Sequence, residues 1–117
     1  MSSTFNTLQW LNDATNLYSS RFPLHVRGPV FFQDGSRLSV QCSVFHYCTI
    51  DDEGNPKSVE IMAMTDTPAM RELYARLGVE DFDEPIGHVP LDKLDAVIAD
   101  MGLQPVPPPD TFQGEQA

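Results

Sequence analysis

The sequence predicts a single α+β domain, in which a three- to four-stranded, mostly antiparallel sheet has helices packed on one face. The length of 117 residues suits one domain that buries roughly two thirds of the surface of its unfolded chain. Apolar and polar residues alternate through residues 37–44, which is typical of a strand with one buried face. Residues 68–77 and 90–101 instead repeat apolar side chains at helical spacing. The two periodicities together indicate a mixed fold.

A first helix is predicted to begin at Asn6 or Thr7, either of which can cap it, and to run to about Ser19. Its apolar stripe comprises Trp10, Leu11, Ala14, Leu17 and Tyr18. Trp10 is interpreted as a core residue, with a stacking platform for a ligand as the alternative. Pro23 restricts the residue before it to extended geometry, so the helix should end there and a short strand should follow over 24–27.

The central strands are predicted from a hairpin signal. Asp34-Gly35 stands between residues 30–32 and residues 37–44, and both turn residues tolerate a positive φ, so these strands should pair antiparallel. The polar segment 51–56 is rich in turn residues. The chain should therefore return as another antiparallel strand over 57–64.

Two helices and a proline-rich segment follow. Pro68 is suited to the first helical position of one helix and Gly78 to its end, while Gly102 is placed to stop a second helix over 90–101. A short strand is expected over 86–89. From Gln104 onward four prolines oppose both helix and sheet, so the prediction is a domain over 1–103 and a disordered or loosely extended tail over 104–117.

The net charge of −10 is unevenly placed. Residues 1–50 hold two acids against three bases and residues 51–117 hold fifteen acids against four bases, so the two parts carry +1 and −11. Proteins that bind nucleic acid neutralise phosphates with lysine and arginine clusters, so direct binding of DNA or RNA is not expected. An acidic surface instead favours a partner protein with a basic surface, or serves solubility alone.

The location of the chain is predicted from what it lacks. No apolar run approaches the ~20 residues needed to cross a bilayer, so a soluble protein with no membrane partner is expected. The first residues show no charged and apolar signal segment, which predicts a cytoplasmic location. The two cysteines should then be reduced thiols. If residues 42–48 stay extended, their Cα atoms lie about 20 Å apart, beyond the ~7 Å limit for a disulfide.

An acidic loop over residues 79–85 is the candidate partner-binding site. It comprises Glu80, Asp81, Phe82, Asp83 and Glu84. The carboxylates would steer a basic partner, and the single aromatic ring would anchor it. The alternative is a solvated loop that Phe82 merely pins to the core.

A second candidate site lies at the exit of the strand over 37–44. His46, Tyr47 and Cys48, with His88, could bind a small, nucleotide-like ligand on a rigid support. Cys42, His46 and Cys48, with His88 or His25 as a fourth ligand, carry atoms that can bind zinc, but their spacing does not fit a structural site, so no metal is expected. A Cys48 thiolate activated by His46 or His88 is the best enzymatic interpretation, yet no catalytic signature accompanies it and no enzyme activity is predicted.

Three segments resemble a group of short, uncharacterised proteins of bacteriophages and prophages. They are Leu8-Gln-Trp-Leu-Asn12, Ser39-Val-Gln-Cys-Ser-Val-Phe-His-Tyr-Cys48, and Val89-Pro-Leu-Asp-Lys-Leu94 with Ile98. In similar chains the His-Tyr-Cys triplet is often followed by Thr-Pro-Arg, whereas here Ile50 and Asp51 follow Thr49. The resemblance implies a phage accessory protein and carries no activity with it.

The functional prediction combines charge with this resemblance. We expect a small acidic phage protein that modulates or inhibits a host factor, such as a defence nuclease complex, by covering a basic surface with its acidic half. Anti-CRISPR proteins are comparable in size and charge, although no motif matches one. A small-ligand binder is the alternative and a cysteine-dependent enzyme the third hypothesis. No cofactor is predicted, and the sequence does not determine the oligomeric state.

Overall fold

The computed structural model describes residues 5–12, 17–19, 26–42 and 48–107 of the chain. Within these ranges the helices are α1 (Thr7–Asn12), α2 (Pro68–Arg76) and α3 (Leu91–Met101). The strands are β1 (Leu17–Ser19), β2 (Val26–Arg27), β3 (Val30–Phe32), β4 (Arg37–Gln41), β5 (Ser58–Ala63), β6 (Ile86–Pro90) and β7 (Pro105–Val106).

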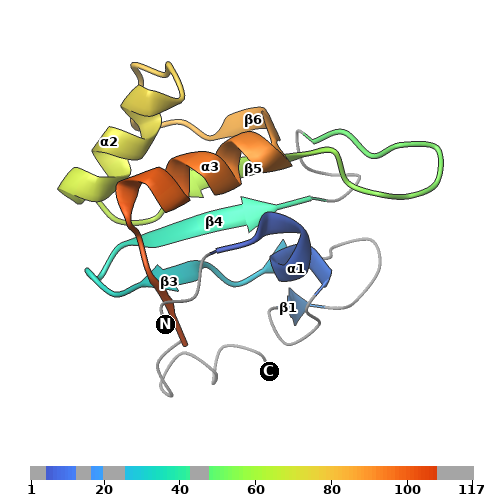
Figure 1. The fold of residues 1–117 in the computed structure, drawn as a ribbon, viewed down its shortest axis with the longest axis horizontal. Helices are drawn as coiled ribbons and strands as arrows, with labels where there is room; N and C mark the ends of the chain where they lie inside the picture. Colours follow the sequence, from blue (N-terminus) through green and yellow to red (C-terminus); the bar gives the residue numbers. More distant parts are fainter. Residues whose placement is uncertain (1–4, 13–16, 20–25, 43–47, 108–117) are drawn as a thin grey trace.

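The main sheet has five strands in the order β6-β5-β4-β3-β7, and every neighbouring pair is antiparallel (Figure 1). β1 and β2 form a separate two-stranded ribbon. The predicted α+β class is therefore confirmed, and the sheet has one strand more than the three or four expected.

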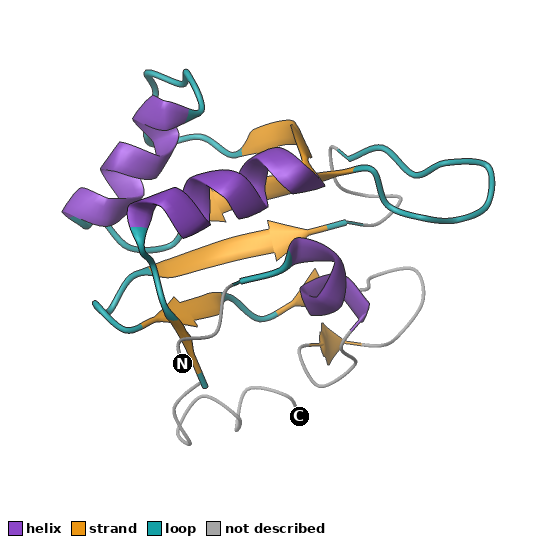
Figure 2. Ribbon diagram, in the orientation of Figure 1, coloured by secondary structure: helices purple, strands orange, loops and turns teal. Residues whose placement is uncertain are grey.

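The core lies between one face of this sheet and the helices, which cover that face (Figure 2). Leu38 and Val40 of β4 pair with Ala63 and Ile61 of β5. The alternation seen in the sequence thus places both β4 side chains in the core, where neither is exposed. From the helices the core receives the fully buried side chains of Met70, Leu73, Leu94 and Ile98.

The predicted hairpin joins β3 and β4, but its loop differs from the expected one. Phe32 N donates to Ser36 O (2.9 Å), so three residues, 33–35, form the loop in place of two. Gly35 has a φ of 93°, whereas Asp34 is not in the left-handed region. Asp34 instead accepts hydrogen bonds from Ser36 N and Ser36 Oγ, both at 2.9 Å. Because the Asp34 carboxylate caps the turn in this way, the turn needs positive φ at only one residue, Gly35.

The first helix is much shorter than expected, because α1 ends at Asn12 and residues 17–19 form β1. Asn6 caps it, with its Oδ1 accepting from Gln9 N at 2.9 Å. A helix as long as the predicted one would include Asn12 and Asp13 in its interior. The side chains of these residue types compete for backbone hydrogen bonds and so disfavour helix interiors. Trp10 is half-buried against the core and donates to Val40 O (3.3 Å), in agreement with a core role.

The proline-rich segment takes part in the sheet, contrary to expectation. Pro105 and Val106 pair with Phe32 and Phe31 of β3, and Gln33 N donates to Gln104 O at 2.8 Å. An edge strand tolerates proline because its outer side needs no N–H donor. Residues 108–117 of the predicted tail lie outside the described residues.

Candidate functional site

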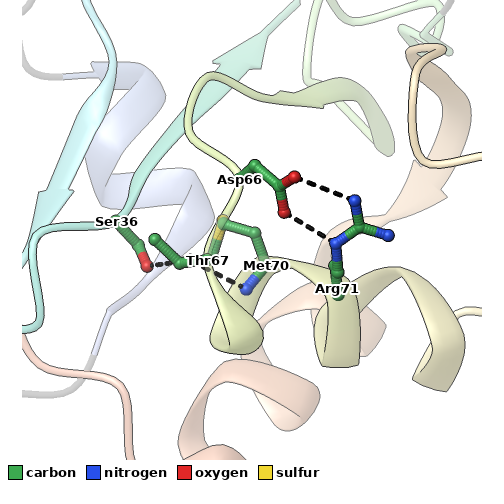
Figure 3. A network of polar contacts seen from close by, with 5 residues as sticks. All are labelled: Ser36, Asp66, Thr67, Met70 and Arg71. Atoms are coloured by element: carbon green, nitrogen blue, oxygen red, sulfur yellow. Dashed lines mark hydrogen bonds and ion pairs between the residues drawn. The ribbon is translucent and has the colours of Figure 1, made fainter.

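A hydrogen bond between the hydroxyls of a buried serine and a half-buried threonine joins the start of α2 to the β3–β4 hairpin. Ser36 is fully buried, and its Oγ lies 2.6 Å from Thr67 Oγ1 (Figure 3). Thr67 is the N-cap of α2 and accepts a hydrogen bond from Met70 N at 3.2 Å, while Pro68 takes up the first helical turn. The hairpin therefore fixes where α2 begins and which way its first turn faces.

Arg71, in the first turns of α2, links this helix start to the acidic loop. Its Nε and Nη2 donate to the two carboxylate oxygens of Asp66 at 2.6 and 2.8 Å, a bidentate pair seen in Figure 3. This hydrogen-bonded pair lowers the pKa of Asp66 and raises that of Arg71. The guanidinium carbon lies 4.6 Å from the ring centroid of Phe82, within cation–π range. Arg71 thus covers the loop's aromatic ring.

Tyr74, one turn further along α2, holds the same loop from below. Its ring centroid is 5.0 Å from that of Phe82. The buried hydroxyl donates to Glu84 O (3.1 Å) and accepts from Ala63 N (3.0 Å), so one atom joins α2, β5 and the loop. Burial raises the pKa of Tyr74 above its usual value of 10.0.

A shallow pocket of about 370 Å³ opens where α2 meets the loop. It is lined by Arg71, Tyr74, Ala75, Gly78, Val79, Glu80 and Phe82. The lining combines two aromatic rings with one cation and one carboxylate.

The four carboxylates of the loop are all exposed, and that of Glu80 belongs to a residue that lines the pocket. Asp81 Oδ1 accepts from Asp83 N at 3.0 Å, which shapes the turn. Three of the four bases in residues 51–117 form ion pairs with other acids: Lys57 with Asp51, Arg71 with Asp66, and Arg76 with both Glu72 and Asp100. Within the described part of the chain, none of Glu80, Asp81, Asp83 and Glu84 forms an ion pair. The loop therefore presents four carboxylates outside any ion pair, and the nearby Arg71, whose pKa is raised in part by Asp83, offsets some of their negative charge.

Of the five predicted partner-binding residues, Glu80 and Phe82 line the pocket, and the four acids are exposed. Phe82 is half-buried between Arg71 and Tyr74, an arrangement that matches the alternative in which this ring pins the loop. Sequence reasoning missed Arg71 as a site residue and assigned Tyr74 only to the helix stripe. Their spacing of three residues, directly before an acidic loop, is the signal that places both on one side of the helix.

The second candidate site is only partly described, since His46 and Tyr47 lie outside the described residues. Thr49, next to Cys48, has its Oγ1 3.3 Å from His88 Nδ1, so the fold brings His88 to the strand exit. His88 has a φ of 56°. It lies where the β5–β6 register shifts between Val59 and Ile61, so a bulge carries this side chain.

The two cysteines lie much closer together than an extended chain allows. Cys42 Sγ is 2.9 Å from Cys48 Sγ, so the premise that residues 42–48 stay extended is wrong, and with it the estimate of about 20 Å between their Cα atoms. Both residues are half-buried, and Cys42 packs against the core cluster. Among the described residues no group of three metal-ligating side chains occurs; His25 and His46 are not among those residues.

Comparisons with protein families, with curated proteins and with solved structures find no match to this chain. No helix in the described ranges has the length and apolar character to cross a membrane. The resemblance to phage accessory proteins therefore stays a prediction, and the site geometry carries the functional inference.

Proposed function

We propose that this protein binds a partner protein through the acidic loop and the adjoining pocket, and that the partner presents a basic surface there. The exposed acids of the loop carry the proposal: its four carboxylates lie outside every ion pair of the described residues. The charge would accelerate encounter, and the pocket beside Phe82 would receive a partner side chain.

The partner we propose is a host factor that the protein modulates or inhibits. A nuclease complex of host defence fits the chemistry, because such complexes hold nucleic acid on basic surfaces that an acidic protein can cover. The phage origin in this proposal comes from the sequence resemblance alone. The contacts of Arg71 and Tyr74 with the loop support its proposed role in binding, because a preorganised surface loses less entropy when it binds.

The test compares two variants of equal charge. Glu80→Lys/Glu84→Lys alters the loop, and Asp52→Lys/Glu53→Lys alters the exposed turn before β5; each changes the formal charge by four, from −10 to −6. Tagged wild type and variants capture proteins from nuclease-treated bacterial lysate, with elution in rising salt and mass spectrometry. We expect a stoichiometric partner with wild type and with the turn variant, and loss of that partner with the loop variant.

Equal loss of capture with both variants would show that only total charge matters and would remove the loop as the binding site. Unchanged capture with the loop variant would do the same. A partner that resists high salt would contradict electrostatic capture.

A small-ligand site at the strand exit is the second candidate, favoured by the contact between Thr49 and His88 beside Cys48. Its test is a thermal shift screen with a nucleotide library, because a ligand at 100 times its dissociation constant adds ~2.7 kcal/mol of stability. His88→Asn keeps the tolerance for positive φ and should remove any shift. Absence of a shift with every compound in wild type would reject this candidate.

A further inference from the structure

The pair of thiols at the end of β4 has the geometry of a site of reversible oxidation. Cys42 Sγ and Cys48 Sγ are 2.9 Å apart, and the length of a disulfide bond requires them to approach by only about 0.9 Å. We propose that Cys42 and Cys48 form an intramolecular disulfide by exchange with a small disulfide such as oxidised glutathione.

The sheet holds both cysteines near the start of β5. Cys42 directly follows Gln41, which pairs with Glu60. On the other side, Thr49 follows Cys48; its N donates to Ser58 Oγ at 2.8 Å, and its O accepts from Lys57 N at 2.7 Å. Each thiol is therefore one residue from backbone that is hydrogen-bonded to the same segment. These backbone contacts account for the short distance between the two sulfur atoms.

The reaction is balanced by the oxidant. One thiol loses its proton, and the thiolate attacks a sulfur of oxidised glutathione, which forms a mixed disulfide and releases one glutathione thiolate. The second thiolate of the protein then attacks the protein sulfur of the mixed disulfide and releases the second glutathione. The protein loses two electrons and two protons, and the oxidised glutathione becomes two molecules of the reduced form.

Partial exposure supports this route, because both residues are half-buried: neither is sealed in the core or fully solvated. A small disulfide can reach one sulfur, and the other lies ready to displace it. The product closes a covalent ring over residues 42–48. His46 and Tyr47 of the second candidate site stand within that ring.

Mass spectrometry of the folded protein tests the pair directly. Reduced wild type, Cys42→Ser and Cys48→Ser are incubated with oxidised glutathione under native conditions and quenched in acid. We expect wild type to lose two hydrogen atoms and retain no glutathione, whereas each single variant retains one glutathione. Wild type that retains glutathione on either cysteine would overturn the proposal, as would wild type that stays reduced.

A second measurement uses wild type alone and so does not depend on whether a variant folds. The fraction oxidised is followed across ratios of reduced to oxidised glutathione, for native protein and for protein unfolded in urea. Because the fold brings the sulfurs together, the native pair should be half-oxidised at a ratio at least about tenfold more reducing than the unfolded pair. Equal midpoints, or an easier oxidation in urea, would contradict a pair assembled by the fold.

Discussion

At the scale of single residues, one hydroxyl organises the candidate site. Tyr74 is almost completely buried, and its oxygen satisfies both Ala63 N and Glu84 O. Tyr74→Phe leaves a buried N–H and a carbonyl without their partner, so it should lower the free energy of unfolding by about 1–3 kcal/mol. Urea denaturation measures the change. An unchanged midpoint would show that water replaces the hydroxyl in both bonds.

The same residue predicts a loss of stability at alkaline pH. Burial raises the pKa of Tyr74 in the folded state, so the unfolded chain releases this proton first as pH rises. The stabilisation is complete below the ordinary pKa of 10.0 and is lost as pH rises through the higher folded value. Wild type should therefore show a steeper fall in Tm above that pH than Tyr74→Phe does. Parallel curves for the two proteins would contradict this assignment.

Arg71 should not tolerate lysine, although the charge is kept. Lysine lacks the planar guanidinium of arginine, so it cannot form the bidentate pair with Asp66 or stack on the ring of Phe82. The loop should therefore open more often. We expect faster amide hydrogen exchange over residues 80–84 in Arg71→Lys. Arg76→Lys is the matched control, since Arg76 forms ion pairs with Glu72 and Asp100 away from the aromatic ring. Equally fast exchange in both variants would show that any change of arginine to lysine in α2 has this effect, and that the contacts of Arg71 with Asp66 and Phe82 are not its cause.

At the scale of elements, the bulge in β6 carries a cost in its backbone. His88 has a φ of 56°, a conformation that side chains with a Cβ adopt at a penalty of roughly 1–2 kcal/mol. His88→Gly should therefore stabilise the fold by up to about 1 kcal/mol, and His88→Val should destabilise it. Thermal unfolding measures both. A destabilised glycine variant would mean that contacts of the imidazole outweigh the strain.

The elements also show which signals in the sequence were sufficient. Alternation over residues 37–44 and helical spacing over 68–77 and 90–101 predicted β4, α2 and α3, because burial on one face imposes these periods. Apolar spacing also predicted a first helix longer than α1, because the spacing takes no account of the low helix propensity of Asn12. The periodicity of the sequence did not predict β7, because its pairing with β3 depends on contacts between residues distant in sequence.

The candidate site was predictable to a similar degree. The five loop residues share one short segment, so composition alone was enough to propose them. Arg71 and Tyr74, by contrast, become part of the site only when α2 packs beside the loop. The approach of Cys42 and Cys48 was not predictable, since it depends on how the chain turns between β4 and β5.

At the scale of the whole molecule, the charge of −10 should destabilise the folded state by self-repulsion. If the loop acids serve binding, Glu80→Lys/Glu84→Lys should raise Tm at low ionic strength, because it relieves this repulsion. The difference should shrink in high salt, where the Debye length falls to about 3 Å. A lower Tm for the variant at low salt would show that the carboxylates stabilise the loop itself.

The two edges of the sheet bear on how a partner attaches. At one edge, β7 has only two residues and begins with Pro105; at the other, β6 is bulged at His88 and ends with Pro90. Prolines, bulges and very short strands are the features by which proteins prevent an added strand from pairing with an open edge. The sheet is thus poorly suited to extension by a strand of another chain. Under the proposed function, recognition would then depend on side chains, and the acidic loop is where we propose that a partner meets them.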